Sequence, residues 1–321
     1  MPDGDPWAVP AALDGERVDR VIALVTGLAR SQVNEMMSAG MVSIAGRTCT
    51  QRSRRVRAGE KVAITGSLPS SVATPLEDRP LASFVEVFVD DQVIVVDKPA
   101  GVVVHPGAAN STGTLIQALV RRYADLSHLD VGDQAGRPGI VHRLDKGTSG
   151  LLVVARTERS RASLVEQLSK RSVSRRYMAL VRSVVESDSG MIDAPLGRSA
   201  RDPTRFSVVA DGREARTRYE VVARYGGPME SSELAVVLET GRTHQIRVHV
   251  AAIGHPVVGD ARYGGRSGPF RGLLEPERFF LHAASLGFDH PGTGERMEFG
   301  SPLPDDLVGA LGKVKDAAGG L

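Results

Sequence analysis

The stretch Ile140–Ala155 reads IVHRLDKGTSGLLVVA. Its two ends are apolar and β-rich, which favours short strands, while its middle is polar and contains glycine, which favours a loop. In that loop a single carboxylate, Asp145, lies between Arg143 and Lys146. Cations this close favour the ionised form of a carboxylate. The stretch therefore predicts either a turn with a local ion pair or a rigidly held carboxylate that serves as a nucleophile or a base.

Several further β-rich runs follow from Leu81 onward, and the segments 113–123 and 160–171 between them have helical character. Strands and helices do not alternate regularly, so a doubly wound parallel sheet is not expected. The pattern favours an α+β fold with a mostly antiparallel or mixed central sheet flanked by helices. The predicted strands lie in FVEVFVDDQVIVVDKPAG, GLLVVART, RRYMALVRSVV, ARTRYEVVARY, SELAVVLET and HQIRVHVAAIG.

The first part of the chain has a different pattern. Within residues 15–65, apolar residues recur at helical spacing and are followed by two strand-like runs, MVSIAGR and EKVAIT. Residues 66–80 are rich in proline and serine, which is typical of a linker. We therefore predict a small α/β domain over 15–65, a linker over 66–80, a larger domain over 81–305 and a flexible tail over 306–321.

Charge is unevenly distributed along the chain. The formal net charge is only +2, which is no signature of a nucleic-acid binder, but residues 15–61 carry an excess of five positive charges. A compact helical module with an arginine cluster is typical of a module that binds RNA or DNA phosphates, and a solvated charged face would give the same pattern. The cluster contains Arg52, and the candidate phosphate contacts are Arg30, Arg47, Arg54, Arg55 and Arg57.

Composition excludes several classes of protein. Hydrophobic residues make up 41% of the chain, which is ample for a packed core. The single cysteine, Cys49, forms neither an intrachain disulfide nor a cysteine metal cluster, which favours a reducing compartment. The N-terminus is unlike a secretory signal, and no stretch approaches the roughly 18 apolar residues of a membrane span. We expect a soluble, cytoplasmic protein without a membrane partner; no feature sets its oligomeric state, although we expect a monomer.

No metal or nucleotide site is expected. His244 and His249 lie five residues apart in THQIRVH, and on a strand they would point to opposite faces. The sequence DKGTSG lacks the order and the following helix of a phosphate loop, and YGGRSGPF opens no apolar helix. Ser149 lacks the surroundings of a nucleophile elbow. Asp145 remains as the candidate for chemistry, and activity should need no metal, nucleotide or other cofactor.

Five motifs, taken together, resemble those of one family. HRLDKGTSGLLVVART resembles the catalytic-aspartate motif of pseudouridine synthases, specifically of the RluA/RluD type that acts on ribosomal RNA. VVDKPAGVVVHPG resembles the first motif of this family, SRRYMALV its tyrosine motif, LETGRTHQIRVHVAAIGHPVVGDARYG its arginine motif and FFLHAASLGFDHP its C-terminal signature. The N-terminal module is similar to the ribosomal-protein-S4-like RNA-binding domain that precedes many of these enzymes. The matches cover most of residues 15–303, in family order.

The resemblance implies an isomerase with a central active-site cleft. The bond between ribose C1′ and base N1 breaks, and the uracil turns and rejoins through C5. By resemblance, Asp145 attacks C1′ or removes a proton from C2′, Tyr177 stacks on the base, and Arg247 fixes the carboxylate. Arg247 lies in the predicted strand HQIRVHV, where a buried charge needs a partner, and Asp145 is a natural one. The candidates for phosphate contacts around the cleft are Arg143, Lys146, Arg175 and Arg176.

The expected substrate is large-subunit (23S) ribosomal RNA, free or in an assembling subunit, and transfer RNA is the alternative. A non-catalytic RNA-binding or chaperone protein of the same fold is a second alternative. A glycoside hydrolase usually needs two paired carboxylates, and only Asp145 lies in a motif. Gly147 departs from the family pattern, in which this position is often acidic. We therefore expect a loop that is more flexible or adapted to a different RNA.

Overall fold

The computed structural model describes residues 6–26, 30–65, 82–105, 113–129, 137–202 and 204–319. The chain forms two compact units that divide between Pro80 and Leu81, and each is treated separately below. The predicted linker over 66–80 and the side chain of Arg30 lie outside the described part of the chain. Across the described ranges, no helix is both long and apolar enough to cross a membrane.

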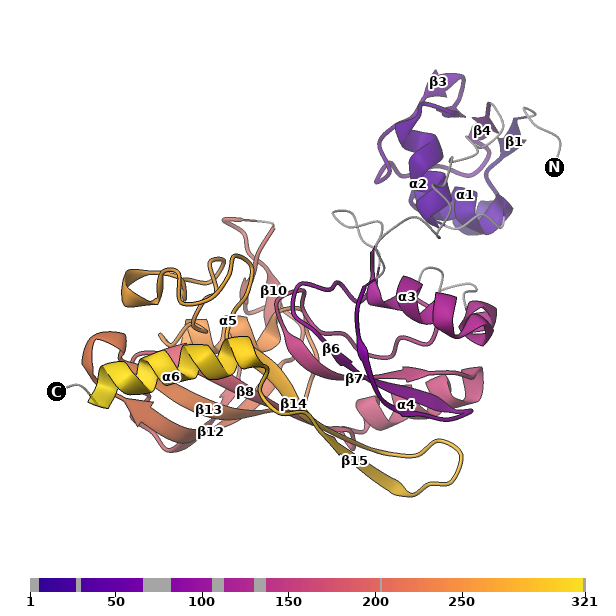
Figure 1. Ribbon diagram of the computed structural model, residues 1–321. Coiled ribbons are helices and arrows are strands. Elements are labelled where there is room, and N and C mark those ends of the chain that lie inside the picture. The colour runs from indigo at the N-terminus through magenta and orange to yellow at the C-terminus, as the bar shows by residue number, and fades with distance from the viewer. Residues whose placement is uncertain are drawn as a thin grey trace. The chain divides into compact units, whose positions relative to one another are not determined.

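The smaller unit, Met1–Pro80, packs two helices against a four-stranded antiparallel sheet (Figure 1). Helices α1 and α2 bury the apolar positions that recur at helical spacing, so the predicted pattern of the module is confirmed. The two predicted strand-like runs form β2 and β4. The elements are β1 (Trp7–Ala8), η1 (Ala11–Leu13), α1 (Val18–Thr26), α2 (Arg30–Ser38), β2 (Val42–Ile44), β3 (Arg47–Thr48) and β4 (Lys61–Ile64).

The larger unit, Leu81–Leu321, is built on a nine-stranded mixed sheet, which confirms the predicted sheet type (Figure 1). Among its described strands, β7 and β14 pair in parallel and the other neighbours are antiparallel. In sheet order the strands are β5 (Val85–Val89), β6 (Val93–Lys98), β7 (Ser149–Ala155), β14 (Leu281–Asp289), β8 (Ser174–Arg182), β13 (Ser231–Leu238), β12 (Arg216–Tyr225) and β9 (Ser189–Asp193), and β15 (Arg296–Gly300) also pairs with β14.

Helices cover both faces of this sheet. On β6, Ile94 and Val96 join the main core, with α3 and α5, while Val93 and Val95 join a second core, with α4. This division follows from the alternation of side chains along a strand. A third core lies between the sheet and α6. The remaining elements are α3 (Leu115–Arg122), η3 (Ala124–Leu129), α4 (Glu158–Ser169), β10 (Leu196–Arg198), β11 (Phe206–Val208), η5 (Gly227–Met229), α5 (Gln245–Ala252), η6 (Gly268–Phe270) and α6 (Asp305–Gly319).

The predicted strand HQIRVHVAAIG is wrong, because Gln245–Ala252 forms α5. Every residue from Gln245 to Val250 is buried, so the helix has no polar stripe that would reveal its period. Ile246 and Val250 pack into the main core, and Val248 packs into a separate cluster on another side of the helix. The β-branched residues that suggested a strand are therefore accommodated by tertiary packing.

The predicted flexible tail over 306–321 is also wrong, because Asp305–Gly319 forms α6. Its apolar side chains at Leu307, Ala310, Leu311 and Val314 have the spacing of one helix face, and all four are buried in the third core. The two acidic residues at its start suit the positive end of a helix dipole. The glycines near the end of the sequence favoured a flexible tail, whereas the spacing of the apolar residues indicates a helix.

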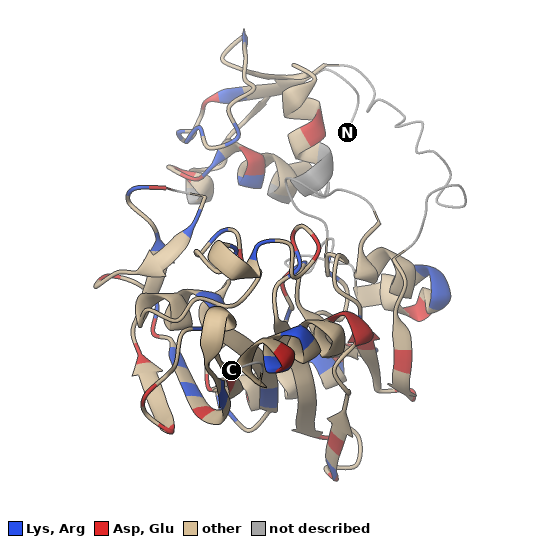
Figure 2. Ribbon diagram, turned by 60° about the vertical axis from the view of Figure 1, so that its left-hand side comes forward, with Lys and Arg blue, Asp and Glu red and all other residues tan. Residues whose placement is uncertain are grey.

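Charged residues of both signs are mixed along the ribbons of the larger unit (Figure 2). This mixture is in keeping with the small net charge of the chain.

Candidate active site

Asp145 lies in the irregular segment 141–148, directly before β7. The expected strand on the other side of this loop is reduced to one isolated bridge, between Ile140 and Val154. One strand and one bridge therefore hold the loop, together with the side chains described next.

Two buried cations bind the backbone carbonyls of the loop. Lys98 is fully buried, and its Nζ donates to the carbonyls of Pro99 and Val102, each at 2.9 Å, and of Lys146 at 3.5 Å. Burial lowers the pKa of Lys98 to about 7, although the charge of Asp145 opposes this shift. Lysine at this position thus ties the end of β6 to the residue that follows Asp145.

Arg278 holds the loop from a second side. Its Nη1 donates to the carbonyl of Gly147 at 2.6 Å, and its Nη2 donates to Ser149 Oγ at 3.1 Å. The Nε of the same side chain pairs with Asp306 Oδ2 at 2.6 Å. Asp306 belongs to the helix that the sequence suggested was a tail, so α6 contributes to the position of the Asp145 loop.

Arg247 joins Asp145 to a second carboxylate. Its Nη1 lies 3.0 Å from Asp145 Oδ2, as the sequence predicted for this pair. Its Nε and Nη2 donate to the two oxygens of Asp260, at 2.6 and 3.0 Å, in a bidentate pair. The backbone amides of Arg262 and Tyr263 also donate to Asp260 Oδ1. Asp260, at 1% exposure, is a site residue that the sequence analysis missed, although it lies in the quoted arginine motif.

The guanidinium of Arg247 lies close to two aromatic rings. Its central carbon lies 4.3 Å from the centre of the Phe279 ring and 5.1 Å from that of Tyr263. Burial alone would lower the pKa of Arg247, but the hydrogen bond to Asp260 and the charges of both carboxylates raise it above its usual value. Arg247 is therefore a permanent, oriented cation beside Asp145.

Tyr177 lies on β8 and faces the main core, with 6% of its surface exposed. Burial raises the pKa of its hydroxyl, the charge of Arg175 opposes this shift, and the charge of Asp145 adds to it. The side chain is thus a neutral phenol. Tyr177 and Asp145 both line the pocket described next.

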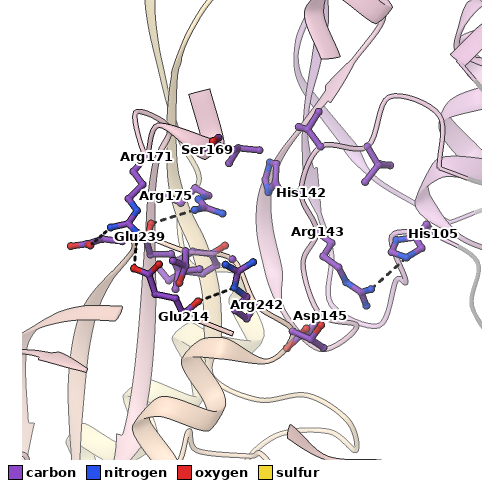
Figure 3. Close-up of a pocket in the computed structure, with 18 of the residues that line it drawn as sticks. His105, His142, Arg143, Asp145, Ser169, Arg171, Arg175, Glu214, Glu239 and Arg242 are labelled. Carbon is purple, nitrogen blue, oxygen red and sulfur yellow. Dashed lines mark hydrogen bonds and ion pairs between the residues drawn. The ribbon is translucent and has the colours of Figure 1, made fainter. Parts of the chain in front are cut away.

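A pocket of about 660 Å³ opens beside Asp145 (Figure 3). Its volume lies within the range of small-molecule sites, so a single nucleoside would fit. Five arginines contribute to its lining, together with Asp145 and two glutamates. The full lining consists of His105, Arg137, Ile140, Val141, His142, Arg143, Asp145, Leu168, Ser169, Arg171, Arg175, Tyr177, Glu214, Leu238, Glu239, Thr240, Gly241, Arg242 and Thr243.

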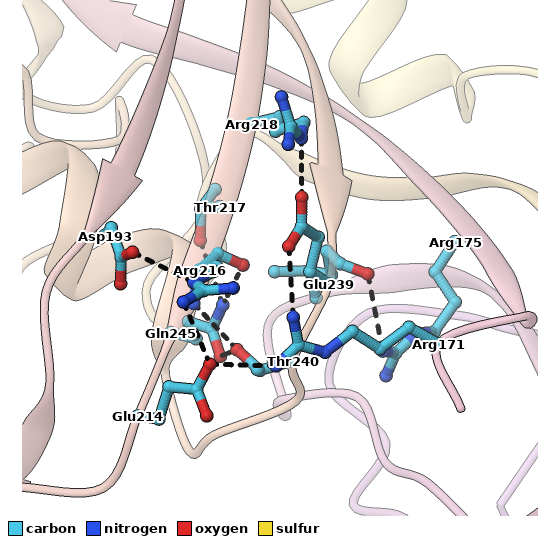
Figure 4. A network of polar contacts seen from close by, with 11 residues as sticks. Arg171, Arg175, Asp193, Glu214, Arg216, Thr217, Arg218, Glu239, Thr240 and Gln245 are labelled. Atoms are coloured by element: carbon cyan, nitrogen blue, oxygen red, sulfur yellow. Dashed lines mark hydrogen bonds and ion pairs between the residues drawn. The ribbon is translucent and has the colours of Figure 1, made fainter. Parts of the chain in front are cut away.

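The two glutamates of the pocket form ion pairs with neighbouring arginines (Figure 4). Arg171 lies 2.8 Å from Glu214 and 3.5 Å from Glu239, and Arg218 lies 2.5 Å from Glu239. Arg216 is paired with Asp193 at 2.9 Å and with Glu214 at 3.4 Å. Much of the positive charge on this side of the pocket is therefore already balanced within the chain.

The four predicted phosphate contacts near the loop are not all in the pocket. Arg143 is exposed and lines it, whereas Arg175 lines it but is buried. Lys146 is absent from the lining and pairs with Glu277 at 2.6 Å. Arg176 is exposed and follows Arg175 on β8, so it points to the opposite face of the sheet and does not belong to the site.

Three histidines near Asp145 were not predicted as site residues. Burial and the charge of Arg143 lower the pKa of His105 to about 4, and its neutral ring lies 3.4 Å from Arg143 Nη1. Burial lowers the pKa of His142 to about 3. His244 Nε2 lies 4.0 Å from Asp145 Oδ1, and its φ of 57° lies in the left-handed region at the start of α5.

His249, which the sequence analysis placed on the opposite face of a strand from His244, is buried on α5. It lies 2.8 Å from Thr217 Oγ1 and 2.9 Å from the carbonyl of Ala194. Within the described ranges, no group of three or more potential metal-ligating His, Cys, Asp or Glu side chains occurs.

Gly147 allows the loop to pack closely against another segment. A Cβ at this position would lie 2.2 Å from the carbonyl oxygen of Glu277 and 2.6 Å from the ring of Phe279. The sequence analysis did not foresee this packing role. Whether the loop is adapted to a particular RNA stays a prediction.

We predict that Gly147→Ala slows the reaction at Asp145 by about 100-fold, since a displacement of the order of 1 Å at a reacting group has that effect. The matched control is Gly300→Ala, because a Cβ at Gly300 meets no atom within 4 Å. Single-turnover rates and thermal melting of both variants provide the measurement. Equal rates in the two variants would show that the contact with Glu277 is unimportant.

Comparison with known proteins identifies the family. The profile of the RNA pseudouridylate synthase family matches residues 92–252, which include Asp145, Tyr177 and Arg247. An uncharacterized RNA pseudouridine synthase of Chloroflexus aurantiacus is 44% identical over 97% of this chain and 93% of that protein. Ribosomal large subunit pseudouridine synthase D of Vibrio cholerae is 40% identical over 92% of this chain and 90% of that protein. The chain therefore belongs to the RNA pseudouridine synthase family of enzymes, which isomerise uridine to pseudouridine.

Solved structures agree with this assignment. Human RNA pseudouridylate synthase domain containing 1 superimposes with a TM-score of 0.54 and 28% identity, over 70% of this chain and 84% of that chain. Human RNA pseudouridylate synthase domain containing 4 has the same TM-score at 24% identity, over 72% of this chain and 93% of that chain, and supports the fold alone.

Proposed function

We propose that this enzyme converts uridines in large-subunit ribosomal RNA to pseudouridine, with Asp145, Tyr177 and Arg247 as its catalytic residues. The substrate is inferred from relatives named ribosomal large subunit pseudouridine synthase D, including those of Vibrio cholerae and Xanthomonas campestris, each 40% identical to this chain. The observation that carries the site is the Arg247–Asp145 pair at 3.0 Å, because Asp145 lines a pocket that Tyr177 also lines. A cytoplasmic location is part of the proposal, and the buried free Cys49 suits it.

Arg247 orients Asp145 in the proposed mechanism. Both possible first steps, attack on C1′ and removal of the C2′ proton, need a carboxylate with a free electron pair. Asp260 binds two of the guanidinium nitrogens and so fixes the side-chain conformation of Arg247. Nη1 is therefore already oriented toward Asp145 before the substrate binds. The neutral phenol of Tyr177 offers a flat surface for the freed base and a hydroxyl that can assist removal of the C5 proton.

The target uridine must leave its stack to reach this pocket, because a base inside folded RNA is not accessible to Asp145. Arg137 and Arg143 are exposed residues of the pocket lining, on the segment that leads to Asp145. We assign them to the phosphates on either side of the flipped nucleotide. Lys146 and Arg176 have no such role in this proposal.

The test is a reaction of the purified enzyme with unmodified transcripts of large-subunit ribosomal RNA and of transfer RNA. The buffer contains a chelator and no added cofactor. We expect pseudouridine at defined positions of the ribosomal RNA. Modification of the transfer RNA alone would replace the proposed substrate, and a requirement for a specific metal ion would contradict cofactor-free chemistry.

The smaller unit is proposed to bind RNA as an S4-like domain. Arg47 and Arg57 are exposed, and among the described residues neither forms an ion pair. The other predicted contacts are partly engaged: Arg54 pairs with Glu60 at 3.2 Å, and Arg55 donates to the carbonyl of Gly15 at 2.7 Å. Arg47 and Arg57 are therefore the strongest candidates for phosphate contacts in this unit.

We predict that each of the substitutions Arg47→Gln and Arg57→Gln flattens the slope of log affinity against log salt by roughly 0.7 to 0.9, the contribution of one phosphate contact to DNA. The control is Arg20→Gln, since Arg20 is exposed in the same unit but pairs with Glu16 at 3.2 Å. Salt titrations of RNA binding measure the slopes. If the slopes of the variants match that of the wild type, Arg47 and Arg57 are solvated side chains that do not contact phosphate. The S4-like assignment then loses its main support.

A further inference from the structure

Arg175 is a buried cation without a counter-ion. Only 7% of the residue is exposed, and no carboxylate within the described ranges lies at ion-pair distance from it. Its Nη2 makes one long hydrogen bond, 3.4 Å to the carbonyl of Leu238, and its Nε is buried with no hydrogen-bond partner. A buried guanidinium in this condition is costly, because it loses its hydration and gains little in return.

The surroundings make this arrangement more unusual. The nearby acids Glu214 and Glu239 pair with Arg171, Arg216 and Arg218, and neither pairs with Arg175. The two glutamates of the pocket thus leave Arg175 without a counter-ion. A buried charge of this kind in a cleft makes Arg175 a candidate functional residue.

Arg175 is directed into the pocket beside Tyr177. The two residues lie two apart on β8, so they share a face of the sheet, and both line the pocket. Figure 3 shows Arg175 among the residues that line it. Gly241 leaves room for the guanidinium, because a Cβ there would lie 2.9 Å from Arg175 Nη1. The cation is therefore next to the proposed platform for the base rather than at the pocket entrance.

The isomerisation moves one negative charge across this pocket. Before reaction the charge resides on Asp145, which Arg247 balances at 3.0 Å. When the N1–C1′ bond breaks, its electron pair stays on N1, and uracil becomes an anion with charge spread over N1, O2 and O4. Asp145 loses its charge in the same step, either by bonding to C1′ or by accepting the C2′ proton. When C5 bonds to C1′, Asp145 leaves C1′ or returns its proton to C2′, so the charge comes back to Asp145 and the base is neutral. The C5 proton then passes to water and N1 takes up a proton, which completes the isomerisation.

We propose that Arg175 is a further catalytic residue, which binds the oxygen atoms of the uracil anion while the base is detached from the ribose. This inference rests on the proposed roles of Asp145 and Tyr177. A cation fixed in a dry pocket stabilises charge that develops during reaction without reorganisation of solvent. Arg247 balances the charge before the bond breaks, and Arg175 balances it afterwards.

The test compares Arg175→Met and Arg175→Lys with the matched control Arg176→Met. Arg176 is exposed on the opposite face of the same strand. Each full-length variant reacts with the RNA that the wild type modifies, in single-turnover reactions at saturating enzyme. We expect Arg175→Met to lower the rate constant by about 10²–10³-fold, the scale for loss of one group that stabilises a developing anion. RNA affinity should change by less than twofold, Arg175→Lys should recover part of the rate, and Arg176→Met should match the wild type.

A second substrate separates charge stabilisation from a structural role. The same RNA is prepared with 5-fluorouridine, whose base is the more stable anion because fluorine withdraws electrons, and loss of the N-glycosidic bond is followed. The defect of Arg175→Met should be at least tenfold smaller on this RNA. An equal defect on both substrates would overturn the proposal.

Two other outcomes are equally decisive. Weaker binding with a reduced salt slope and an unchanged rate constant at saturation would make Arg175 a phosphate contact and would overturn the proposal. Thermal melting shows whether Arg175→Met folds. If it does not, the ratio of the rates on the two substrates is measured for Arg175→Lys instead. A ratio equal to that of the wild type would then overturn the proposal. A wild-type enzyme that modifies no uridine overturns the proposed function, and this inference with it.

Discussion

Substitution of Asp145 by asparagine should abolish isomerisation while RNA binding stays within about twofold of the wild type. The amide has nearly the shape of the carboxylate but carries no charge, so it neither attacks C1′ nor accepts the C2′ proton. Arg247 would remain in place, because Asp260 binds it through two nitrogens. We expect a fall in rate on the order of 10⁴–10⁶-fold, the scale for loss of a nucleophile or base.

The measurement is a single-turnover assay of the Asp145→Asn enzyme, with filter binding of the same RNA as the control for folding and affinity. The half-buried position of Asp145, in a loop held through the carbonyls of Lys146 and Gly147, gives little reason for the variant to unfold. Turnover within tenfold of the wild type would refute the assignment of Asp145.

Removal of Arg247 should be nearly as damaging. In Arg247→Ala the carboxylates of Asp145 and Asp260 lose their common cation, and Asp260 is almost fully buried. Breaking a buried pair from one side costs about 3–5 kcal/mol, or the carboxylate takes up a proton instead. For the rate, the loss of one preorganised charge at a reacting group lowers kcat by about 10²–10³-fold, and we expect a fall of at least that order.

The conservative variant Arg247→Lys tests the geometry rather than the charge. Three guanidinium nitrogens reach two carboxylates here, and an ammonium group cannot reproduce that fork. We expect Arg247→Lys to keep less than a tenth of the wild-type rate. Arg216→Ala is the control, because Arg216 also pairs with an aspartate, Asp193, but lies at the surface. A fully active Lys variant would show that charge alone suffices, and a fully active Ala variant would refute the pairing.

The parts of the site that could be predicted from the sequence are those carried by local patterns. Asp145 lies in a polar loop before an apolar strand, and Tyr177 lies in a clear strand pattern, so both could be placed in their elements. The pair of Arg247 with Asp145 was also expected, because a buried charge needs a partner, but Arg247 reaches the carboxylate from a helix rather than from the predicted strand.

The contacts that could not be predicted join residues far apart in the chain. Arg278, shortly before β14, and Lys98, at the end of β6, donate hydrogen bonds to loop carbonyls. A sequence does not indicate which side chain will bind a backbone carbonyl. Arg175 and Arg176 are adjacent and chemically identical, yet one is buried in the pocket and the other is exposed on the opposite face. Only the register of β8 decides which of the two belongs to the site.

Pseudouridine mapping in large-subunit ribosomal RNA is the most direct test of the central claim. The RNA is taken from cells that lack this gene and carry either the wild-type gene or the Asp145→Asn gene, with equal protein levels checked by immunoblot. The account predicts that defined pseudouridines disappear on deletion, return with the wild-type gene and stay absent with the variant. Their return with Asp145→Asn, or an unchanged ribosomal RNA map on deletion, would contradict it.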